Sequence, residues 1–425
     1  KGSNINLIID LFQFPIDKNC KNEKGYTPLL LACLLRKYDI MRYLLMHPDV
    51  DVNATTNDSD NILFYSTEKA FLLNDILLLD LVKNPRFNFN YQNKFGDTFL
   101  HAVIANSFME TSFYIPEFIA KIDPNIKNNR GITALDIAVF KRDYSAIINL
   151  LNRPNIVVTE YANRSNILIF AISQQKTDVA QLLIQKGFDV DQMDENLTTP
   201  LMMATIKGNI SIIKQLIATR RIDINKCNSS KQNAFLIASM IRGGESMLSL
   251  MLTHPLLDPN WENQEGETAL LNTITYSNQR SAAVLLLNKR VNPNYLSKKK
   301  VYPFLAAVKS ANLSIITSFL TNESTNLSIT DEENSNAIHY AVLSRSSDVL
   351  SLLHDYNIDM MHKNNNNLTP IELALVLQNI DLAISLSFFI VPKLTFIREK
   401  TPEHQRQYDL CMSVRTLASN RLHDM

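Results

Sequence analysis

The segment Gly25-Tyr26-Thr27-Pro28-Leu29-Leu30-Leu31-Ala32 recurs along the chain in similar copies. Thr199-Pro200-Leu201 and Thr369-Pro370-Ile371 open the two clearest of these copies, and weaker ones fill the intervals. Eleven units align in this way, and they begin at Thr27, Asn61, Thr98, Thr133, Asn166, Thr199, Asn233, Thr268, Tyr302, Asn336 and Thr369. The starts are 33 to 37 residues apart, and so constant a period indicates a repeat array rather than a set of independent domains.

Each unit opens with the signals of a short helix. Ten of the eleven start positions are Thr or Asn, whose side-chain oxygen can accept a hydrogen bond from the free N–H groups of a first helical turn. The second residue after the start is always large and apolar, as at Leu29, and the fifth is mostly small, as at Ala32. Because these two positions share one face of a helix, the pattern predicts helices that pack closely against one another.

The rest of the unit predicts a second helix and an extended closing segment. Apolar pairs such as Leu44-Leu45 and Leu352-Leu353 mark the second helix. Segments such as Asp51-Val52-Asn53 and Asp223-Ile224-Asn225 close the unit. We expect each closing segment to form a short strand that leads into a turn.

With these features the chain resembles the ankyrin repeat family, whose unit of roughly 33 residues combines a turn with two helices and carries a T-P-L-H-x-A signature. Further good copies are Gly131-Ile132-Thr133-Ala134-Leu135 and Asn336-Ala337-Ile338-His339-Tyr340-Ala341. The resemblance implies an all-α ankyrin-repeat solenoid, a curved right-stacked array of antiparallel helix pairs with a C-terminal helical cap. We expect a partial N-terminal repeat at 1–20, eleven repeats at 21–392, and a capping helix or linker at 393–425.

The turns depart from the family pattern because most of its glycines are missing. The chain has 45 Asn and 9 Gly, and Asn is the non-glycine residue that best tolerates left-handed backbone. Such a composition is typical of AT-rich genomes, including those of some protists. We expect Asn196, Ser59 and Lys300 to occupy turn positions where the family places glycine.

The two ends of the chain differ from the repeats. Residues 1–26 fit only the second half of a unit and the first residue is Lys1, so we expect the N-terminus to be incomplete. Near the other end, the sequence predicts a helix capped by Thr401. The residues expected to pack that helix on the last repeat are Leu410, Val414 and Leu417.

Composition and motifs argue against catalysis and against two classes of partner. Lys+Arg and Asp+Glu both number 42, so no bulk field attracts nucleic acid or an anionic membrane. The four Cys form no CxxC, the eight His form no HExxH, and no glycine-rich phosphate-binding motif is present. We therefore expect a non-enzymatic chain with no metal or other cofactor. The longest apolar run, 382–391, is too short to span a bilayer, so we expect no membrane insertion.

The resemblance also assigns roles to individual residues. His101 and His339 occupy the fourth signature position, where hydrogen bonds between repeats are implied. The implied partner-binding positions lie just before the helix start and two and three residues after the small Ala, on the concave face and turn tips. In this chain they include Tyr26, Leu35, Phe95, Phe140, Lys141, Met240, Ile241, Tyr276, Lys299 and Lys309. Two alternatives stay open: neighbouring repeats could bury the apolar members, and Lys299, within the triplet Lys298-Lys299-Lys300, could instead complement the acidic turns beside it.

The expected function is a non-catalytic scaffold or adaptor that binds a protein partner along the concave ankyrin groove. We expect this segment to be cytoplasmic and monomeric, without a nucleic-acid partner. A second hypothesis is the targeting or anchoring arm of a larger multidomain enzyme, channel or regulator. A third is a secreted, host-directed ankyrin effector. The identity of the partner does not follow from the sequence, because repeat proteins share a scaffold and differ in a few surface side chains.

Overall fold

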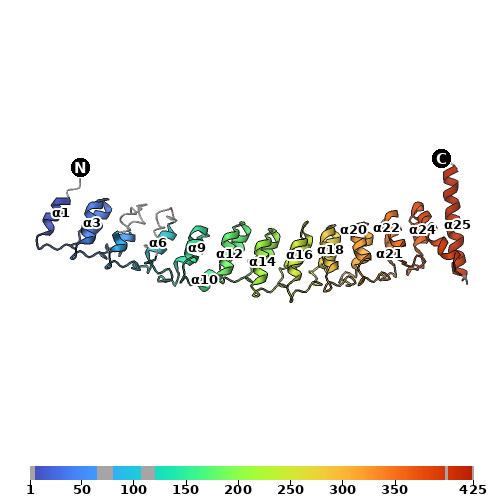
Figure 1. Cartoon of the computed structure of the whole chain (residues 1–425), viewed down its shortest axis with the longest axis horizontal. Coiled ribbons are helices and arrows are strands. Elements are labelled where there is room, and N and C mark those ends of the chain that lie inside the picture. The colour runs from blue at the N-terminus through green and yellow to red at the C-terminus, as the bar shows by residue number, and fades with distance from the viewer. Residues whose placement is uncertain (1–4, 65–79, 107–119, 398–400, 424–425) are drawn as a thin grey trace. The chain divides into compact units, whose positions relative to one another are not determined.

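The computed structural model describes residues 5–64, 80–106, 120–397 and 401–423 (Figure 1). The chain divides into two compact units, Lys1–Asp189 and Val190–Met425. In the described residues every regular element is a helix, apart from one isolated bridge between Cys227 and Asn233. Within each unit the short helices stand side by side in chain order, as an all-α repeat array requires (Figure 1).

The helices come in pairs, a first helix and a second helix in each repeat. The first unit contains α1 (Ile5–Phe12), α2 (Pro28–Leu34), α3 (Tyr38–Met46), α6 (Phe99–Ala105), α8 (Ala134–Lys141), α9 (Tyr144–Leu151), α10 (Glu160–Asn163), α11 (Ile167–Ser173) and α12 (Thr177–Gln185). The second unit contains α13 (Pro200–Ile206), α14 (Ile210–Ala218), α15 (Ala234–Met240), α16 (Glu245–Leu252), α17 (Ala269–Thr275), α18 (Gln279–Leu287), α19 (Pro303–Lys309), α20 (Leu313–Leu320), α21 (Ala337–Leu343), α22 (Ser347–His354), α23 (Pro370–Val376), α24 (Ile380–Thr395) and α25 (Pro402–His423).

The predicted helix starts are capped as expected at most positions. Thr199 Oγ1 accepts from the N–H of Met202 at 3.2 Å, and Asn233 Oδ1 accepts from that of Leu236 at 2.9 Å. The prediction is wrong at Asn166, which has a φ of 56° and forms no side-chain cap. There the extra short helix α10 replaces the extended turn, so the chain enters α11 from a left-handed residue instead.

The apolar positions of the pattern form the core of each unit. Leu135 and Ala138 in the first unit and Phe304 and Ala307 in the second are completely buried. In the second unit each first helix packs on its own second helix, and each of them before α23 also packs on the first helix of the next repeat, as α13 does with α14 and α15. Burial of one large apolar side chain contributes roughly 1.5–3 kcal/mol, so the stabilisation is spread along the array. Ser66, predicted at a small position, lies outside the described residues.

Asparagine side chains link successive repeats. Asn225 Oδ1 accepts from the N–H of Asp258 at 2.9 Å, and Asn225 Nδ2 donates to the carbonyl of Leu256 at 2.7 Å. An equivalent residue accepts from the next repeat at seven further positions, of which the last is Asn294, and most of these residues also donate. We call this set the asparagine ladder: Asn19, Asn53, Asn90, Asn125, Asp191, Asn225, Asn260 and Asn294.

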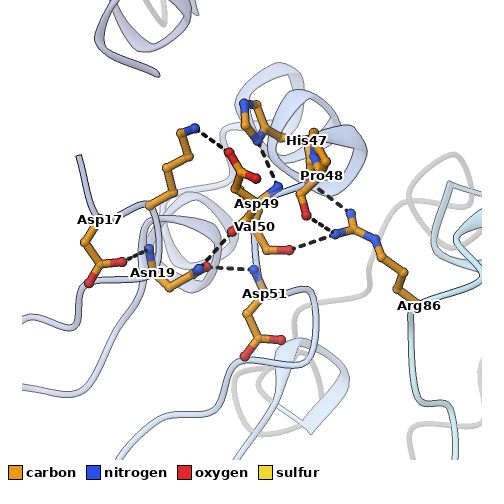
Figure 2. Close-up of polar contacts among 9 residues, drawn as sticks. Asp17, Asn19, His47, Pro48, Asp49, Val50, Asp51 and Arg86 are labelled. Atoms are coloured by element: carbon orange, nitrogen blue, oxygen red, sulfur yellow. Dashed lines mark hydrogen bonds and ion pairs between the residues drawn. The ribbon is translucent and has the colours of Figure 1, made fainter. Parts of the chain in front are cut away.

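A second hydrogen bond joins the rungs of the ladder. Asp51 N–H donates to Asn19 Oδ1 at 2.7 Å, while Asp51 Oδ1 accepts from the N–H of Asn53 at 2.9 Å. Figure 2 shows the start of this relay, with Asn19 between Asp17 and Asp51. Side chains therefore satisfy the backbone groups that a strand would otherwise pair. For this reason the closing segments are not the short strands that we expected.

Arginine side chains brace the same segments from the next repeat. The Arg86 guanidinium donates to the carbonyl groups of Leu45 at 3.2 Å, His47 at 3.0 Å, Pro48 at 2.7 Å and Val50 at 3.1 Å (Figure 2). Arg290 does the same in the second unit, to the carbonyl groups of Leu252, His254, Pro255 and Leu257. In both cases a cation meets the unpaired carbonyl groups at the end of a second helix, where the helix dipole favours positive charge.

The turns use left-handed residues other than glycine. Ser59 and Lys300 have positive φ, as expected, but at the third position the left-handed residue is Leu197 with a φ of 57°, not Asn196. Asp194 holds this turn, because its Oδ1 accepts from the N–H groups of Asn196 at 2.9 Å and Thr198 at 2.8 Å. The acceptor at the start of the turn fixes which residue becomes left-handed.

The packing of the C-terminal helices differs in detail from the packing that we expected. Thr401 Oγ1 caps α25 by accepting from the N–H of His404 at 3.2 Å. Val414 is buried as expected, but Leu410 is only partly buried and Leu417 is 55% exposed. The residues buried with Val414 are Gln407 and Cys411. The buried stripe thus runs through positions 407, 411 and 414, which share the face of α25 that packs on α24. α24 itself continues past Pro392 to Thr395.

His101 and His339 make the hydrogen bonds between repeats that were implied for them. His101 Nε2 lies 2.9 Å from the carbonyl of Ile132, and His339 Nε2 lies 3.1 Å from that of Leu368. Both rings are fully buried. Burial lowers the pKa of each below the ordinary value of 6.5, since it disfavours the charged ring.

We predict that acidification destabilises the fold through these two rings. The unfolded chain takes up protons near pH 6.5 while the buried rings stay neutral, so stability is present above that pH and is lost as the pH falls below it. The free energy of unfolding, measured with urea at pH 7.5 and at pH 5, should fall less between these two pH values for the double variant His101→Gln/His339→Gln than for the wild type. The exposed His354→Gln serves as the control, and equal losses in all three proteins would contradict the prediction.

We predict that Asn125→Ala weakens the array by breaking one rung of the ladder. Asn125 accepts from the N–H of Val157 at 2.8 Å and donates to the carbonyl of Asn155 at 2.7 Å. Two lost hydrogen bonds should lower the free energy of unfolding by about 1–3 kcal/mol. The control is Asn152→Ala in the next repeat, an exposed residue outside the ladder. The measurement is the urea midpoint, and equal effects of the two substitutions would count against the ladder.

We predict that Leu197→Gly stabilises the second unit although it removes an apolar side chain. Left-handed backbone costs an ordinary residue roughly 1–2 kcal/mol, and glycine avoids this cost. Glycine also has more conformational entropy in the unfolded state, which offsets about 0.5–1 kcal/mol of the gain. A net gain of about 0.5 kcal/mol in unfolding free energy should follow. Asn196→Gly, one residue away and not left-handed, should give no gain.

Candidate interaction surface

Exposed apolar side chains line up at the ends of the first helices in the second unit. Ile206, Leu343 and Val376 are the last residues of α13, α21 and α23, and they are 52%, 47% and 64% exposed. Met240 ends α15 and is half-buried, and Tyr276, one position further along its repeat than the other four, follows α17 with 50% of its surface exposed. Because these first helices pack in chain order from α13 to α23, the five residues recur on one face of the unit. We call them the apolar row.

The other predicted contacts of the second unit differ in their surroundings. Ile241 is half-buried directly after Met240, and Lys309 is exposed at the end of α19. Lys299 lies on a turn and is engaged within the array, since its Nζ is 3.2 Å from Glu267 and 3.6 Å from Glu265. The hydrogen bond that Lys299 donates to Glu267 is the main reason that the pKa of Lys299 lies above its ordinary value.

The basic triplet complements the acidic turns on both sides. Lys298 pairs with Glu262 at 3.1 Å, where the carboxylate is almost fully buried. Lys300 pairs with Glu332 at 3.5 Å, on the next turn along the chain. These pairs favour the structural interpretation of the triplet over a partner contact.

The predicted contacts of the first unit are mostly exposed. Leu35, Phe95 and Phe140 are 56%, 59% and 75% exposed, and Tyr26 is half-buried. Lys141 is exposed as a residue, but its Nζ donates to the carbonyl groups of Ile104, at 3.2 Å, and Ala105. Lys141 thus caps the end of α6, so its charge already has a structural role.

Sequence reasoning missed several exposed residues on the same surface. Ile206, Leu343 and Val376 occupy the seventh position after their helix starts, the same position as Phe140 and Met240, so the signal was present in the repeat alignment. Tyr161, 50% exposed on α10, had no such signal, because the repeat pattern does not predict α10.

The short helix α10 creates a recess on the first unit. Tyr161 and Arg164 from this region and Val139, Phe140 and Arg142 from the end of α8 line a cavity of about 540 Å³. The Arg142 guanidinium lies 3.7 Å from the centre of the Phe170 ring, which holds it beside the cavity. Two aromatic side chains and two guanidinium groups therefore surround one recess.

Two other kinds of site were searched for in the residues that the structure describes. No group of three or more His, Cys, Asp and Glu in the described ranges is arranged to hold a metal ion. None of the described helices combines the length and the apolar character needed to cross a bilayer.

Comparison with known proteins identifies the repeat. A family model described as "Ankyrin repeats (3 copies)" matches residues 146–228, and a single-repeat model, "Ankyrin repeat", matches residues 24–54. A protein of Acanthamoeba polyphaga mimivirus named for its ankyrin repeats is 24% identical over 234 residues, which are 49% of this chain and 30% of that protein. Human Rabankyrin-5 is 24% identical over 141 residues, 33% of this chain and 12% of its own length.

A third relative, from Dictyostelium discoideum, is named "Probable serine/threonine-protein kinase". It is 33% identical over 92 residues, 22% of this chain and 11% of that protein. The matches therefore span less than a third of the length of these curated relatives.

Solved ankyrin repeat domains are also similar. The domain of Bcl-3 aligns with a TM-score of 0.43 and 23% identity, over 50% of this chain and 97% of that domain. The domain of human ASB11 aligns with a TM-score of 0.44 and 16% identity, over 55% of this chain and 98% of that domain.

Family models thus match inside the first unit and across the border between the units, and the helix-pair repeat continues through the described residues on both sides. Ankyrin repeats generally mediate protein–protein interaction. The chain contains ankyrin repeats, identified by family models at residues 24–54 and 146–228.

Proposed function

We propose that this chain is a scaffold or adaptor that binds a protein partner along the face formed by its first helices and turn tips. The observation that carries the proposal is the apolar row, five large side chains on one face of the second unit. Scattered exposed apolar residues need no explanation, but residues gathered on one face are typical of interaction sites. The aromatic members Phe95 and Phe140 of the first unit support the same function, since aromatic residues are enriched at binding hot spots.

The row lies where the fold does not require apolar residues. The seventh position after the helix start is Lys309 in α19, a charged residue in an otherwise regular repeat. An apolar side chain at this position therefore contributes little to the core, and its exposed part is available to a partner. We propose that Tyr26, Leu35, Ile241 and Lys309 extend the same contact surface.

The chain is proposed to act without catalysis, metal or cofactor, in the cytoplasm and as a monomer. The expectation of no catalysis, metal or cofactor rests on the sequence, which has no catalytic or metal-binding motif. The residues proposed to contact the partner include no paired nucleophile and base. The neutral total charge supports a protein rather than a nucleic acid as the partner.

A second candidate is that the array is the targeting arm of a larger protein. The match to a Dictyostelium protein named as a kinase favours this candidate, since that match covers only 11% of the relative. Sequencing the full transcript tests it: an attached enzyme, channel or regulator domain would move the search for activity to that domain.

We predict that charges in the apolar row abolish partner capture while leaving the fold intact. The variant is the triple substitution Ile206→Asp/Tyr276→Asp/Val376→Asp, used as bait in a pull-down with quantitative mass spectrometry. Each hot-spot residue contributes about 2 kcal/mol or more, so capture should fall at least roughly 30-fold. Thermal unfolding should change little, because all three side chains are about half exposed or more.

The matched control places the same charges on another exposed apolar pair, Leu256→Asp/Leu287→Asp. These residues are 73% and 84% exposed and lie outside the first helices. Capture by the control should equal that of the wild type. If both variants retain the same proteins as the wild type, the apolar row is not the contact surface.

A further inference from the structure

Two consecutive second helices in the second unit begin without a side-chain cap. Among the other second helices, α9, α14, α20, α22 and α24 are capped by Asp143, Asn209, Asn312, Ser346 and Asn379, whereas α3 and α12 of the first unit, preceded by Lys37 and Lys176, also lack a cap. α16 and α18, which pack against each other, have no such cap. The N–H of Gln279 donates to the carbonyl of Ser277 at 3.1 Å, but no side chain at the N-cap of either helix accepts from the other first-turn N–H groups, which can therefore meet another acceptor.

Each helix lacks its cap for a structural reason. Gly244 precedes α16, and a Cβ at this position would lie 2.1 Å from the carbonyl oxygen of Ala238, so no capping residue fits. Asn278 precedes α18, but its Nδ2 donates to the carbonyl of Ser239 at 2.9 Å. Its amide is thus turned toward the preceding repeat and away from the helix that it would cap.

A polar cavity of about 400 Å³ lies at these two helix starts. Arg242, Ser277, Arg280 and Ser281 are among the residues that line it. Ser281 is 1% exposed, and its Oγ has no hydrogen-bond partner. The residues at this third helical position elsewhere in the unit are Ile212, Met247, Ile315, Val349 and Leu382, so a buried hydroxyl here is exceptional. An unpaired buried hydroxyl is costly, and it indicates that a ligand completes the site.

The donors outnumber the acceptors in this cavity. Arg242 and Arg280 supply two guanidinium groups, and Ser281 Oγ and the two helix starts supply further donors. The one carboxylate among the lining residues is Glu245, which lies 3.7 Å from Arg280. A compact dianion with several acceptor oxygens matches this set of donors better than a carboxylate does.

We propose that this cavity binds a phosphate monoester. Its phosphoryl oxygens accept from Arg242, Arg280, Ser281 and the first-turn N–H groups of α16 and α18, and Arg280 exchanges Glu245 for the phosphate. Free phosphate compounds and phosphorylated side chains share this chemistry. Met240, Ile241 and Tyr276 directly precede the cavity-lining loops, so we assign the phosphate to a phosphorylated side chain of the protein partner. That assignment, unlike the site itself, rests on the proposed function.

The test uses the whole chain and a fluorescent alanine-rich peptide that carries one phosphoserine. Fluorescence anisotropy should show binding of this peptide and none of its unphosphorylated twin, and inorganic phosphate should compete. Arg280→Gln and Arg242→Gln should each weaken binding about tenfold, as expected for a charge-assisted hydrogen bond. Ser281→Ala should also weaken binding of the phosphopeptide several-fold. If the Ser281 hydroxyl made no contact with the phosphate, its removal would leave binding unchanged.

Glu245→Gln should act in the opposite direction and strengthen binding several-fold, since it removes the competing carboxylate. Two matched controls should leave binding unchanged. Arg345→Gln removes an arginine from the same loop of a repeat whose second helix is capped, and Glu265→Gln removes one of the two carboxylates beside Lys299 on a distant turn.

The outcomes separate the site from the proposed function. If inorganic phosphate binds, as shown by a rise in thermal midpoint that Arg280→Gln abolishes, but the phosphopeptide does not, the site stands and the ligand is a free phosphate compound. If neither binds, or if the controls weaken binding as much as the site variants, the site is overturned. The scaffold function is decided separately, by the pull-down with the apolar-row variants.

Discussion

The structure depends on the hydrogen bonds that asparagine amides make between repeats. A repeat has a core of its own, but that core is completed only when the next helix pair covers it, so the distance between closing segments must be fixed. An amide can do this because it accepts and donates at once, as Asn225 does toward Asp258 and Leu256. Arg86 and Arg290 reinforce the same segments from the next repeat. The apolar row is held in line because the repeats beneath it are held in register.

Local signals in the sequence predicted the helices well and the connections poorly. Thr199 and Asn233 reveal helix starts because a cap and its helix are adjacent in the chain. The ladder joins residues more than 30 positions apart, so the closing segments were mistaken for strands. Leu197 shows the same limit, since Asp194 and not residue preference decides which turn residue is left-handed.

The candidate surface was predictable to the extent that it follows the repeat. Phe140, Met240 and Tyr276 were predicted from their position; Phe140 and Tyr276 are exposed and Met240 is half-buried, and the exposed Val376 could have been predicted in the same way. The sequence overstated the role of charge, because Lys141 and Lys299 hold partners inside the array. The cavity near Ser281 could not be predicted, since it depends on the direction in which the Asn278 amide points. The proposed phosphate site therefore lies where two repeats deviate from the common pattern, whereas the apolar row follows that pattern.

The asparagine ladder also determines how the protein responds to chemical ageing. Asparagine is thermolabile because the next backbone nitrogen can attack its side-chain amide and expel ammonia, and water then opens the resulting ring to aspartate or isoaspartate; this chain places asparagine at the links between its repeats. The ladder residues precede Cys20, Ala54, Tyr91, Ile126, Lys226, Trp261 and Tyr295 and never glycine, so the backbone nitrogen that attacks the amide is always sterically hindered. Asp191 shows what remains after such damage, since its carboxylate still accepts from Asp223 at 2.6 Å. An aged joint therefore keeps one of its two hydrogen bonds and loosens without separating.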